Sequence, residues 1–249
     1  HYAGVPCEMD RIMAIAARHG LLVVEDAAQA LLSTYKGKAL GSIGHLGCLS
    51  FHETKNIISG EGGALLVNDG RFVDRAEIIR EKGTNRSQFF RGEVDKYTWV
   101  DIGSSYLPSE LVSAFLYAQL EHAGQIIEKR RGICTSYAAQ LGGLQQAGHL
   151  RLPIFDGDSN GHMFYILLDS LATRSKLIAH LKSRDILPVF HYVPLHSAPA
   201  GKRFGRAGSS MRHTDEISER LLRLPLYYEM TGSDITRVCT AIEDFFSPG

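Results

Sequence analysis

The feature that most constrains the fold is a short apolar run at residues 21–24, which ends in the carboxylates Glu25 and Asp26. A helical pattern over residues 6–19 precedes it, and Gly20 is typical of a helix C-terminus. A short continuous apolar run is typical of a strand buried on both faces of a parallel sheet. Helix followed by strand predicts an α/β layer, in which ligands bind at the carboxyl ends of strands. We therefore expect Asp26 at a ligand-binding edge.

A second constraint is a lysine that lies between small polar residues and a glycine-rich turn. Residues 50–56 begin with Ser50 and contain Lys55, and the glycine-rich residues 60–63 follow. A lysine amine can form a Schiff base with the aldehyde of pyridoxal 5′-phosphate (PLP). A carboxylate such as Asp26 can keep the pyridine nitrogen of PLP protonated, and the Ser50 hydroxyl can bind its phosphate. The pattern predicts a PLP site built around Lys55.

Composition excludes several classes of partner. The chain has 249 residues, enough for one large domain or two smaller ones, and 44% of them are hydrophobic. Its 27 basic and 27 acidic residues balance, which argues against nucleic acid and anionic membranes as partners. The four cysteines lack the spacing of zinc ligands, so we expect no metal and reduced thiols, as in the cytoplasm. No apolar run is long enough to cross a bilayer.

The pattern of predicted helices and strands differs between the two halves of the chain. We expect residues 1–125 to form a cofactor-binding domain and residues 126–249 a smaller α+β domain. Between them, Ser109 is expected to cap a long helix that reaches Leu141. The candidates for its buried face are Leu111, Phe115, Ala118, Ile126 and Ile133. The irregular residues 83–108 form a long loop, which in a compact domain is usually functional.

Four stretches carry a resemblance to a known family: residues 24–29, 50–56, 60–63 and 191–196. With them the chain resembles, over its whole length, the sugar aminotransferases of the DegT/DnrJ/EryC1/StrS family. The resemblance implies an α/β fold of the PLP-dependent transferase type I, as in aspartate aminotransferase, with residues 1–125 as the remainder of the large domain. It also implies PLP as cofactor, a nucleotide sugar and L-glutamate as substrates, and a homodimer.

The resemblance also implies roles for individual residues of the cofactor site. Lys55 would bind the cofactor covalently and transfer protons, Asp26 would pair with the pyridine nitrogen, and Gln29 would lie near the ring. Ser50 would bind the phosphate. His52 would lie close to the phosphate, although a packed histidine with a local partner is an almost equal interpretation.

Other residues are implied more indirectly. The family usually places an asparagine of the neighbouring subunit on the phosphate, and Ser105 takes that position here. Arg86 belongs to a basic loop that either contacts the substrate diphosphate or is simply solvated. His191 and Tyr192 end a strand, where they either reach the sugar or form a buried aromatic pair.

A narrower resemblance concerns the substrate. Residues 81–92, 101–107 and 219–226 resemble the members of the family that make an amino sugar of enterobacterial common antigen. The implied reaction converts dTDP-4-dehydro-6-deoxy-D-glucose into dTDP-4-amino-4,6-dideoxy-D-galactose. Family members carry a domain-sized stretch before the point where this chain starts, so we expect the chain to lack the N-terminal part of the large domain.

Three other functions compete with this interpretation. The PLP-dependent sugar dehydratases of the family replace the lysine with histidine, and Lys55 argues against that reaction. A nicotinamide enzyme is disfavoured because no G-x-G-x-x-G follows a strand. A truncated, non-catalytic remnant that only dimerises or binds a partner stays open.

Overall fold

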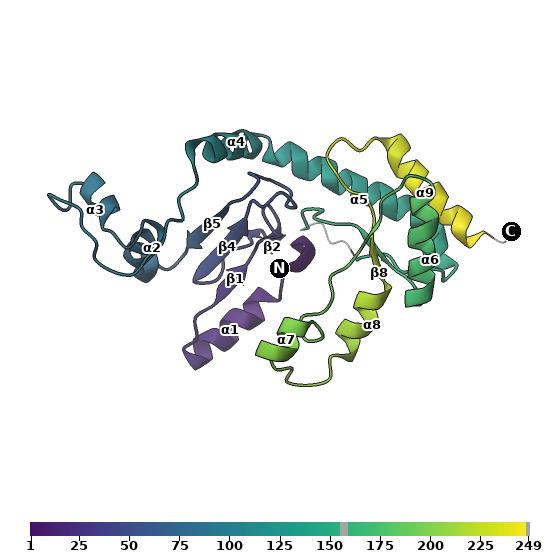
Figure 1. Cartoon of the computed structure of the whole chain (residues 1–249), viewed down its shortest axis with the longest axis horizontal. Helices are drawn as coiled ribbons and strands as arrows, with labels where there is room; N and C mark the ends of the chain where they lie inside the picture. The colour runs from purple at the N-terminus through teal and green to yellow at the C-terminus, as the bar shows by residue number, and fades with distance from the viewer. Residues whose placement is uncertain (155–158, 248–249) are drawn as a thin grey trace. The chain divides into compact units, whose positions relative to one another are not determined.

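The computed structural model describes residues 1–154 and 159–247 (Figure 1). Its contacts divide the chain into two compact units. The first unit contains residues 1–127 and also residues 159–162, and the described remainder forms the second unit. A segment from the second half of the sequence therefore belongs to the first unit.

A three-stranded sheet of order β1-β4-β5 organises the first unit. β1 (Val24–Asp26) pairs in parallel with β4 (Leu46–Ser50), and β5 (Gly63–Val67) pairs antiparallel to β4. α1 (Met9–His19) precedes β1, and Gly20 ends this helix in the left-handed conformation, as predicted. The α/β character is confirmed, although the sheet is mixed rather than purely parallel.

A small hairpin follows β1. It consists of β2 (Thr34–Tyr35) and β3 (Lys38–Ala39), which are antiparallel. Lys36 and Gly37 join the two strands with φ angles of 51° and 79°. Positive φ at both central residues is the signature of the tight turn whose twist matches a hairpin.

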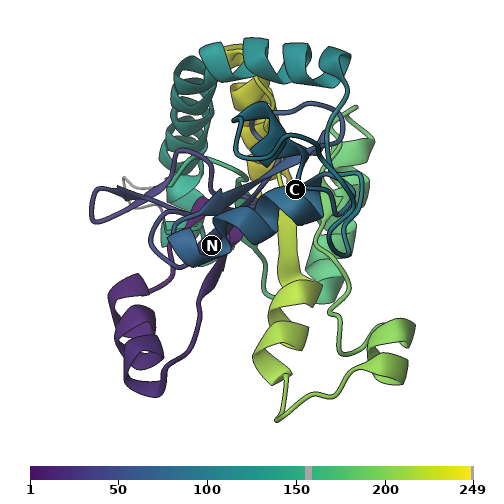
Figure 2. The same ribbon diagram turned by 90° about the vertical axis from the view of Figure 1, so that its left-hand side faces the viewer.

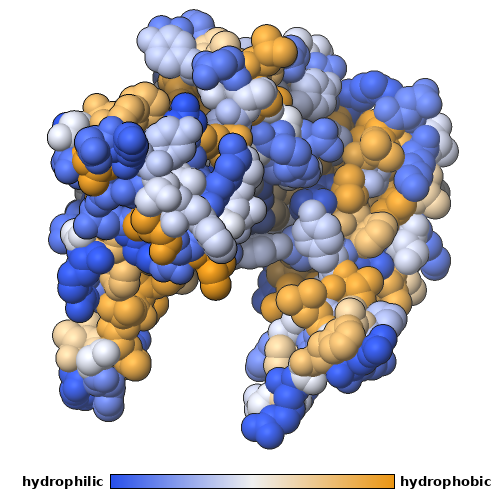
Figure 3. Space-filling view, turned by 60° about the vertical axis from the view of Figure 1, so that its left-hand side comes forward, coloured by the Kyte–Doolittle hydropathy of each residue, from blue (hydrophilic) through white to orange (hydrophobic). Residues whose placement is uncertain are grey.

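The prediction that residues 21–24 form a strand buried on both faces is wrong. The strand is Val24–Asp26, and Leu21, Leu22 and Val24 are 55%, 55% and 58% exposed. β1 is an edge strand whose one partner among the described residues is β4, so its apolar neighbours stay at the surface. Apolar surface of the chain is drawn in orange in Figure 3.

The remaining helices of the first unit are short, and their bounds are η1 (Tyr2–Gly4), η2 (Gly70–Phe72), α2 (Val73–Arg80), α3 (Arg86–Phe90) and α4 (Glu110–Glu121). Ser109 caps α4 as predicted, because its hydroxyl accepts a hydrogen bond from the Val112 amide at 3.3 Å. The expected single helix is interrupted at His122, and α5 (Ala123–Gln146) begins after it.

Only part of the predicted buried face of these helices is confirmed. Ile126 and Ile133, on α5, are 8% and 2% exposed. Leu111 and Phe115, on α4, are 84% and 50% exposed, and Ala118 is exposed as well. The side of α4 that packs inward carries Val112 and Leu116 instead, and Leu116 packs against the buried cluster of Phe51, Ile57, Ala123 and Ile126.

The second unit packs helices on an antiparallel sheet of order β6-β8-β7. Its helices towards the C-terminus are drawn in green and yellow in Figure 2. The strands are β6 (Tyr165–Leu167), β7 (Val189–Phe190) and β8 (Leu221–Arg223). The helices beside the continuation of α5 are α6 (Leu171–Lys182), α7 (Pro199–Phe204), α8 (Arg212–Arg220) and α9 (Gly232–Phe246). One hydrophobic core unites the unit, and the Tyr137 hydroxyl within it donates to the Pro225 carbonyl at 2.9 Å.

Candidate active site

The site begins where two neighbouring parallel strands of the first unit end. In the register of β1 and β4, Asp26 lies opposite Cys48, and Ser50 is the last residue of β4. Both strands run in the same direction, so Asp26 and Ser50 lie at the same edge of the sheet. This is the edge at which α/β sheets bind ligands.

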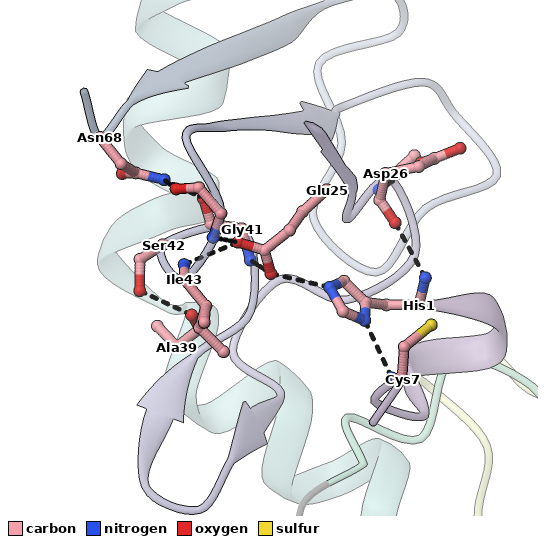
Figure 4. A network of polar contacts seen from close by, with 11 residues as sticks. His1, Cys7, Glu25, Asp26, Ala39, Gly41, Ser42, Ile43 and Asn68 are labelled. Carbon is pink, nitrogen blue, oxygen red and sulfur yellow. Dashed lines mark hydrogen bonds and ion pairs between the residues drawn. The ribbon is translucent and has the colours of Figure 1, made fainter. Parts of the chain in front are cut away.

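Glu25, the neighbour of Asp26, fixes the end of β1 from the interior (Figure 4). Glu25 is 3% exposed. Its carboxylate accepts hydrogen bonds from the amides of Gly41, at 2.9 Å, Ile43, at 2.6 Å, and Gly44, and it contacts the His1 imidazole at 2.8 Å. Side chains alternate along a strand, so a buried Glu25 directs Asp26 to the opposite side. Asp26 is exposed there, and its Oδ1 accepts a hydrogen bond from the Ala28 amide at 3.1 Å.

The lysine loop leaves the end of β4 and returns through the glycine-rich turn. The Phe51 amide donates to Gly62 O at 2.8 Å, and the Glu53 amide donates to Gly60 O at 2.9 Å. The Lys55 amide donates to His52 O at 2.9 Å. Gly60 has a φ of 81°, which glycine adopts without a steric penalty. The backbone that carries Lys55 is therefore held on both sides.

Lys55 lines a small hollow that is open to solvent in the first unit. The hollow is lined by Ala28, Gln29, Leu31, Ser50, Lys55, Asn56, Ile57, Asn160 and His162. The structure thus brings together three of the predicted site residues, namely Gln29, Ser50 and Lys55. Asp26 lies outside this lining, at the end of the adjacent strand.

The residues around the hollow fit PLP. The fit rests on an amine, a hydroxyl and a side-chain amide in one hollow, with a carboxylate at the next strand end. These four groups match an aldehyde, a phosphate, a ring hydroxyl and a ring nitrogen. Ala28 adds a small side chain to the wall, which leaves room for a flat ring.

His52, Ser105 and Arg86 belong to the first unit but do not line the hollow. His52 is engaged locally, with Nδ1 at 2.9 Å from Thr54 Oγ1 and Nε2 at 3.6 Å from Glu61 Oε1. Ser105 is exposed and pairs with Glu81 in an isolated bridge. The Arg86 guanidinium donates to Glu81 Oε1 at 2.7 Å and lies over the rings of Phe90 and Tyr97.

His191 and Tyr192 belong to the second unit, directly after β7. Their ring centroids are 5.3 Å apart, and the Arg223 guanidinium lies 5.5 Å from the centre of the Tyr192 ring. Partial burial lowers the pKa of His191, and the positive charge of Arg223 lowers it further. The two residues therefore form an aromatic pair beside a cation within their own unit.

Sequence reasoning missed three polar residues that line the same hollow as Lys55. Asn56 directly follows the lysine, and its Nδ2 donates to Asn160 O at 3.1 Å. The Asn56 Oδ1 contacts His162 Nδ1 at 2.9 Å. Residues 160 and 162 come from the segment that returns to the first unit, and no pattern in the sequence marks that return.

Comparison with known proteins identifies the family. The DegT/DnrJ/EryC1/StrS aminotransferase family matches residues 1–243. The chain therefore belongs to this family, whose enzymes depend on PLP and have the type I fold. The predictions of family, fold class and cofactor are confirmed.

Individual relatives cover the chain almost completely. An uncharacterized protein of Methanocaldococcus jannaschii is 32% identical over 99% of this chain and 66% of its own length. The spore coat polysaccharide biosynthesis protein SpsC of Bacillus subtilis is 31% identical over 98% of this chain and 64% of its own length. The crystal structure of DesV from S. venezuelae, in complex with a ketimine intermediate, is 28% identical with a TM-score of 0.86, over 100% of this chain and 64% of DesV. The chain thus spans slightly less than two thirds of these relatives.

Two further observations concern the described residues alone. They contain no group of three or more histidine, cysteine, aspartate or glutamate residues arranged to hold a metal ion. Among them, no helix combines the length and apolar character that crossing a membrane requires.

Proposed function

We propose that the protein is a PLP-dependent sugar aminotransferase whose cofactor lysine is Lys55. The observation that carries the proposal is that Lys55, Ser50 and Gln29 line one hollow at the carboxyl edge of the sheet. Asp26 ends the neighbouring parallel strand. Membership of the family supports the same assignment.

Each of these residues has a defined task in the proposal. The Lys55 amine would hold the cofactor covalently and, when free, would take up or return a proton at the reacting carbon of the substrate. The Asp26 carboxylate would pair with the pyridine nitrogen and keep it protonated. The Ser50 hydroxyl would donate to the phosphate, and the Gln29 amide would contact the ring or its hydroxyl. Bound PLP supplies an electron sink for the substrate carbon.

The proposed substrates are L-glutamate, as amino donor, and a nucleotide-linked 4-keto-6-deoxyhexose. Residues 81–92, 101–107 and 219–226 support dTDP-4-dehydro-6-deoxy-D-glucose as the acceptor and dTDP-4-amino-4,6-dideoxy-D-galactose as the product. The name of the relative SpsC, a spore coat polysaccharide biosynthesis protein, supports a product that enters a surface polysaccharide. In this assignment Arg86 contacts the diphosphate, and His191 and Tyr192 contact the sugar.

A homodimer is part of the proposal. The long loop and α4 expose large apolar side chains, namely Trp99 (75%), Ile102 (77%), Tyr106 (67%) and Leu111 (84%). Burial of such side chains favours association of subunits. Ser105 lies in the same loop, is exposed, and is proposed to donate to the phosphate in the site of the other subunit, near His52.

The test is to add PLP to the purified protein and to record the visible absorbance of the lysine–cofactor linkage. Lys55→Ala should abolish this absorbance, whereas Lys38→Ala, which changes an exposed lysine of the hairpin, should retain it. Incubation with glutamate and dTDP-4-dehydro-6-deoxy-D-glucose should then give a 4-amino sugar, whose C4 configuration is read by NMR.

The alternative to this proposal is a protein without enzymatic activity. Protein that stays colourless with excess PLP, yet associates with itself or a partner, would support the non-catalytic remnant. An equal absorbance in wild type and Lys55→Ala would remove Lys55 from the proposal.

A further inference from the structure

A buried asparagine joins the two segments that carry the lysine and the glutamine of the hollow. Asn160 is 1% exposed. Its Nδ2 donates to the carbonyls of Gln29 and Leu31, both at 2.9 Å. Its own backbone carbonyl accepts from Asn56 Nδ2 at 3.1 Å. One residue is thus bonded to the segment of Gln29 and to the neighbour of Lys55.

The orientation of both amide side chains follows from their partners. Carbonyl oxygens only accept hydrogen bonds, so Asn160 and Asn56 must present their NH2 groups to them. The Asn56 Oδ1 therefore faces His162 and must accept, which places the hydrogen of the contact on His162 Nδ1. Asn56 is held at both ends of its amide, directly after Lys55.

The segment that Asn160 holds would not keep its conformation without support. Leu32 has a φ of 61°, in the left-handed region, which costs a non-glycine residue about 1–2 kcal/mol. Asn160 bonds the carbonyl immediately before Leu32, and Ser33 N donates to Ala30 O at 2.9 Å. The two hydrogen bonds of Asn160 therefore hold a strained turn whose residues line the hollow.

We propose that Asn160 and His162 are positioning residues, which set the separation between Lys55 and Gln29 across the hollow. The inference rests on the proposed function, because its consequence is the affinity for PLP. Asn160 acts on both segments, and His162 acts on the lysine side through Asn56. At metal sites, removal of a hydrogen-bonding partner that orients a ligating residue typically costs about 10- to 100-fold in affinity, and we expect an effect of the same order here.

The experiment compares two asparagines with the same bonding pattern. Asn68 Nδ2 also donates to two backbone carbonyls, those of Gly41 at 2.8 Å and Gly44 at 3.0 Å, but Asn68 does not line the hollow. PLP is titrated by visible absorbance against wild type, Asn160→Ala and Asn68→Ala. We expect the dissociation constant to rise about tenfold or more for Asn160→Ala and less than about twofold for Asn68→Ala. Equal constants for wild type and Asn160→Ala, or equal increases in both variants, would overturn the inference.

A second pair of variants decides the question if Asn160→Ala does not fold. Asn can reproduce a hydrogen bond from His Nδ1, whereas Leu cannot. His162→Asn is therefore expected to bind PLP within about threefold of wild type, and His162→Leu about tenfold more weakly. Equal affinities in the two variants would overturn the inference. A wild-type protein that does not bind PLP at all would instead overturn the proposed function, so the two failures are distinguishable.

Discussion

The two units of the chain are stabilised in different ways. The second unit has one continuous cluster of 19 buried hydrophobic residues, whereas the first has two separate clusters of five and four. In contrast, every buried polar or charged residue of the described chain lies in the first unit: Glu25, Ser33, Asn56, Ser59, Glu81, Ser159 and Asn160. Contacts between apolar side chains do not depend on a particular bond angle. Hydrogen bonds, in contrast, hold their donor and acceptor groups at defined distances and angles. The buried polar residues of the first unit therefore position the groups of the candidate site, whereas the buried apolar residues of the second unit mainly stabilise its fold.

The largest effect is expected where the polar network of the first unit is broken at its centre. Glu25→Ala leaves the buried amides of Gly41 and Gly44, and the partly buried amide of Ile43, without their acceptor. Each buried unsatisfied donor costs about 1–3 kcal/mol, so we expect a loss of about 4 kcal/mol in local stability. Hydrogen exchange followed by mass spectrometry, which resolves the units separately, should show faster exchange of residues 24–27 and 41–44.

The control for this prediction is Glu25→Gln, which retains one carbonyl oxygen as an acceptor. It should lose less than half of the stability that Glu25→Ala loses. If Glu25→Ala exchanges as slowly as wild type at residues 41–44, then the network does not stabilise the first unit, and the comparison of the units fails.

The second unit should respond to a cavity instead. Leu222 is 0% exposed in the central strand β8, and Leu222→Ala is expected to cost about 3 kcal/mol, from lost burial and the remaining cavity. Leu65→Ala, in β5 of the first unit, changes a side chain that is 49% exposed and should cost less than about 1 kcal/mol. Hydrogen-exchange rates of the amides in β6 and α9 measure the effect of Leu222→Ala. The rates of the amides in β4 measure the effect of Leu65→Ala. Equal losses in both variants would contradict the contrast in packing.

Two glycines with the same backbone conformation test how tightly the first unit is built around Asn160. Gly4 and Gly37 both have a φ of 79°. A Cβ at Gly4 would lie 2.2 Å from Asn160 Oδ1, whereas a Cβ at Gly37 would have no atom within 4 Å. Both alanine variants carry the strain of positive φ, about 1–2 kcal/mol, and Gly4→Ala must also displace Asn160.

We therefore expect Gly4→Ala to be less stable than Gly37→Ala by about 1–2 kcal/mol, measured by urea denaturation. Only Gly4→Ala should also speed hydrogen exchange at residues 28–33. A smaller loss for Gly4→Ala than for Gly37→Ala would mean that the position of Asn160 is not constrained by its surroundings.

The part of the site that could be predicted from the sequence is the part that local rules determine. Strands end in polar residues at the binding edge, so the sequence pattern predicts that Ser50 and Lys55 lie together, and the family resemblance adds Gln29; all three line the hollow. The same reasoning failed for Asn160 and His162, because they belong to the first unit although they lie more than 100 residues after Lys55 in the sequence. A contact between residues 56 and 160 has no local signature.

In the fold, too, features that depend on neighbouring residues could be predicted, whereas features that depend on residues distant in the sequence could not. Caps and turns were predictable, as at Gly20 and Ser109, because they depend on a few neighbouring residues. The burial of Leu111 and of residues 21–24 was predicted wrongly, because periodicity shows which face is apolar and not what covers it. The cofactor and substrate roles of all the predicted site residues, Lys55 included, stay predictions.

The smallest expected effect is a pH dependence that belongs to the second unit. Partial burial, and then the charge of Arg223, lowers the pKa of His191 below its ordinary value of 6.5. The unfolded chain therefore binds a proton more readily than the folded chain, and stability should fall as the pH drops below 6.5 toward the lowered value. His191→Asn should flatten this slope, measured as the urea midpoint against pH, whereas His213→Asn, on the exposed face of α8, should leave it unchanged. If His191→Asn keeps the slope of wild type, another group titrates in this window, and the aromatic pair beside Arg223 does not couple protonation to the stability of its unit.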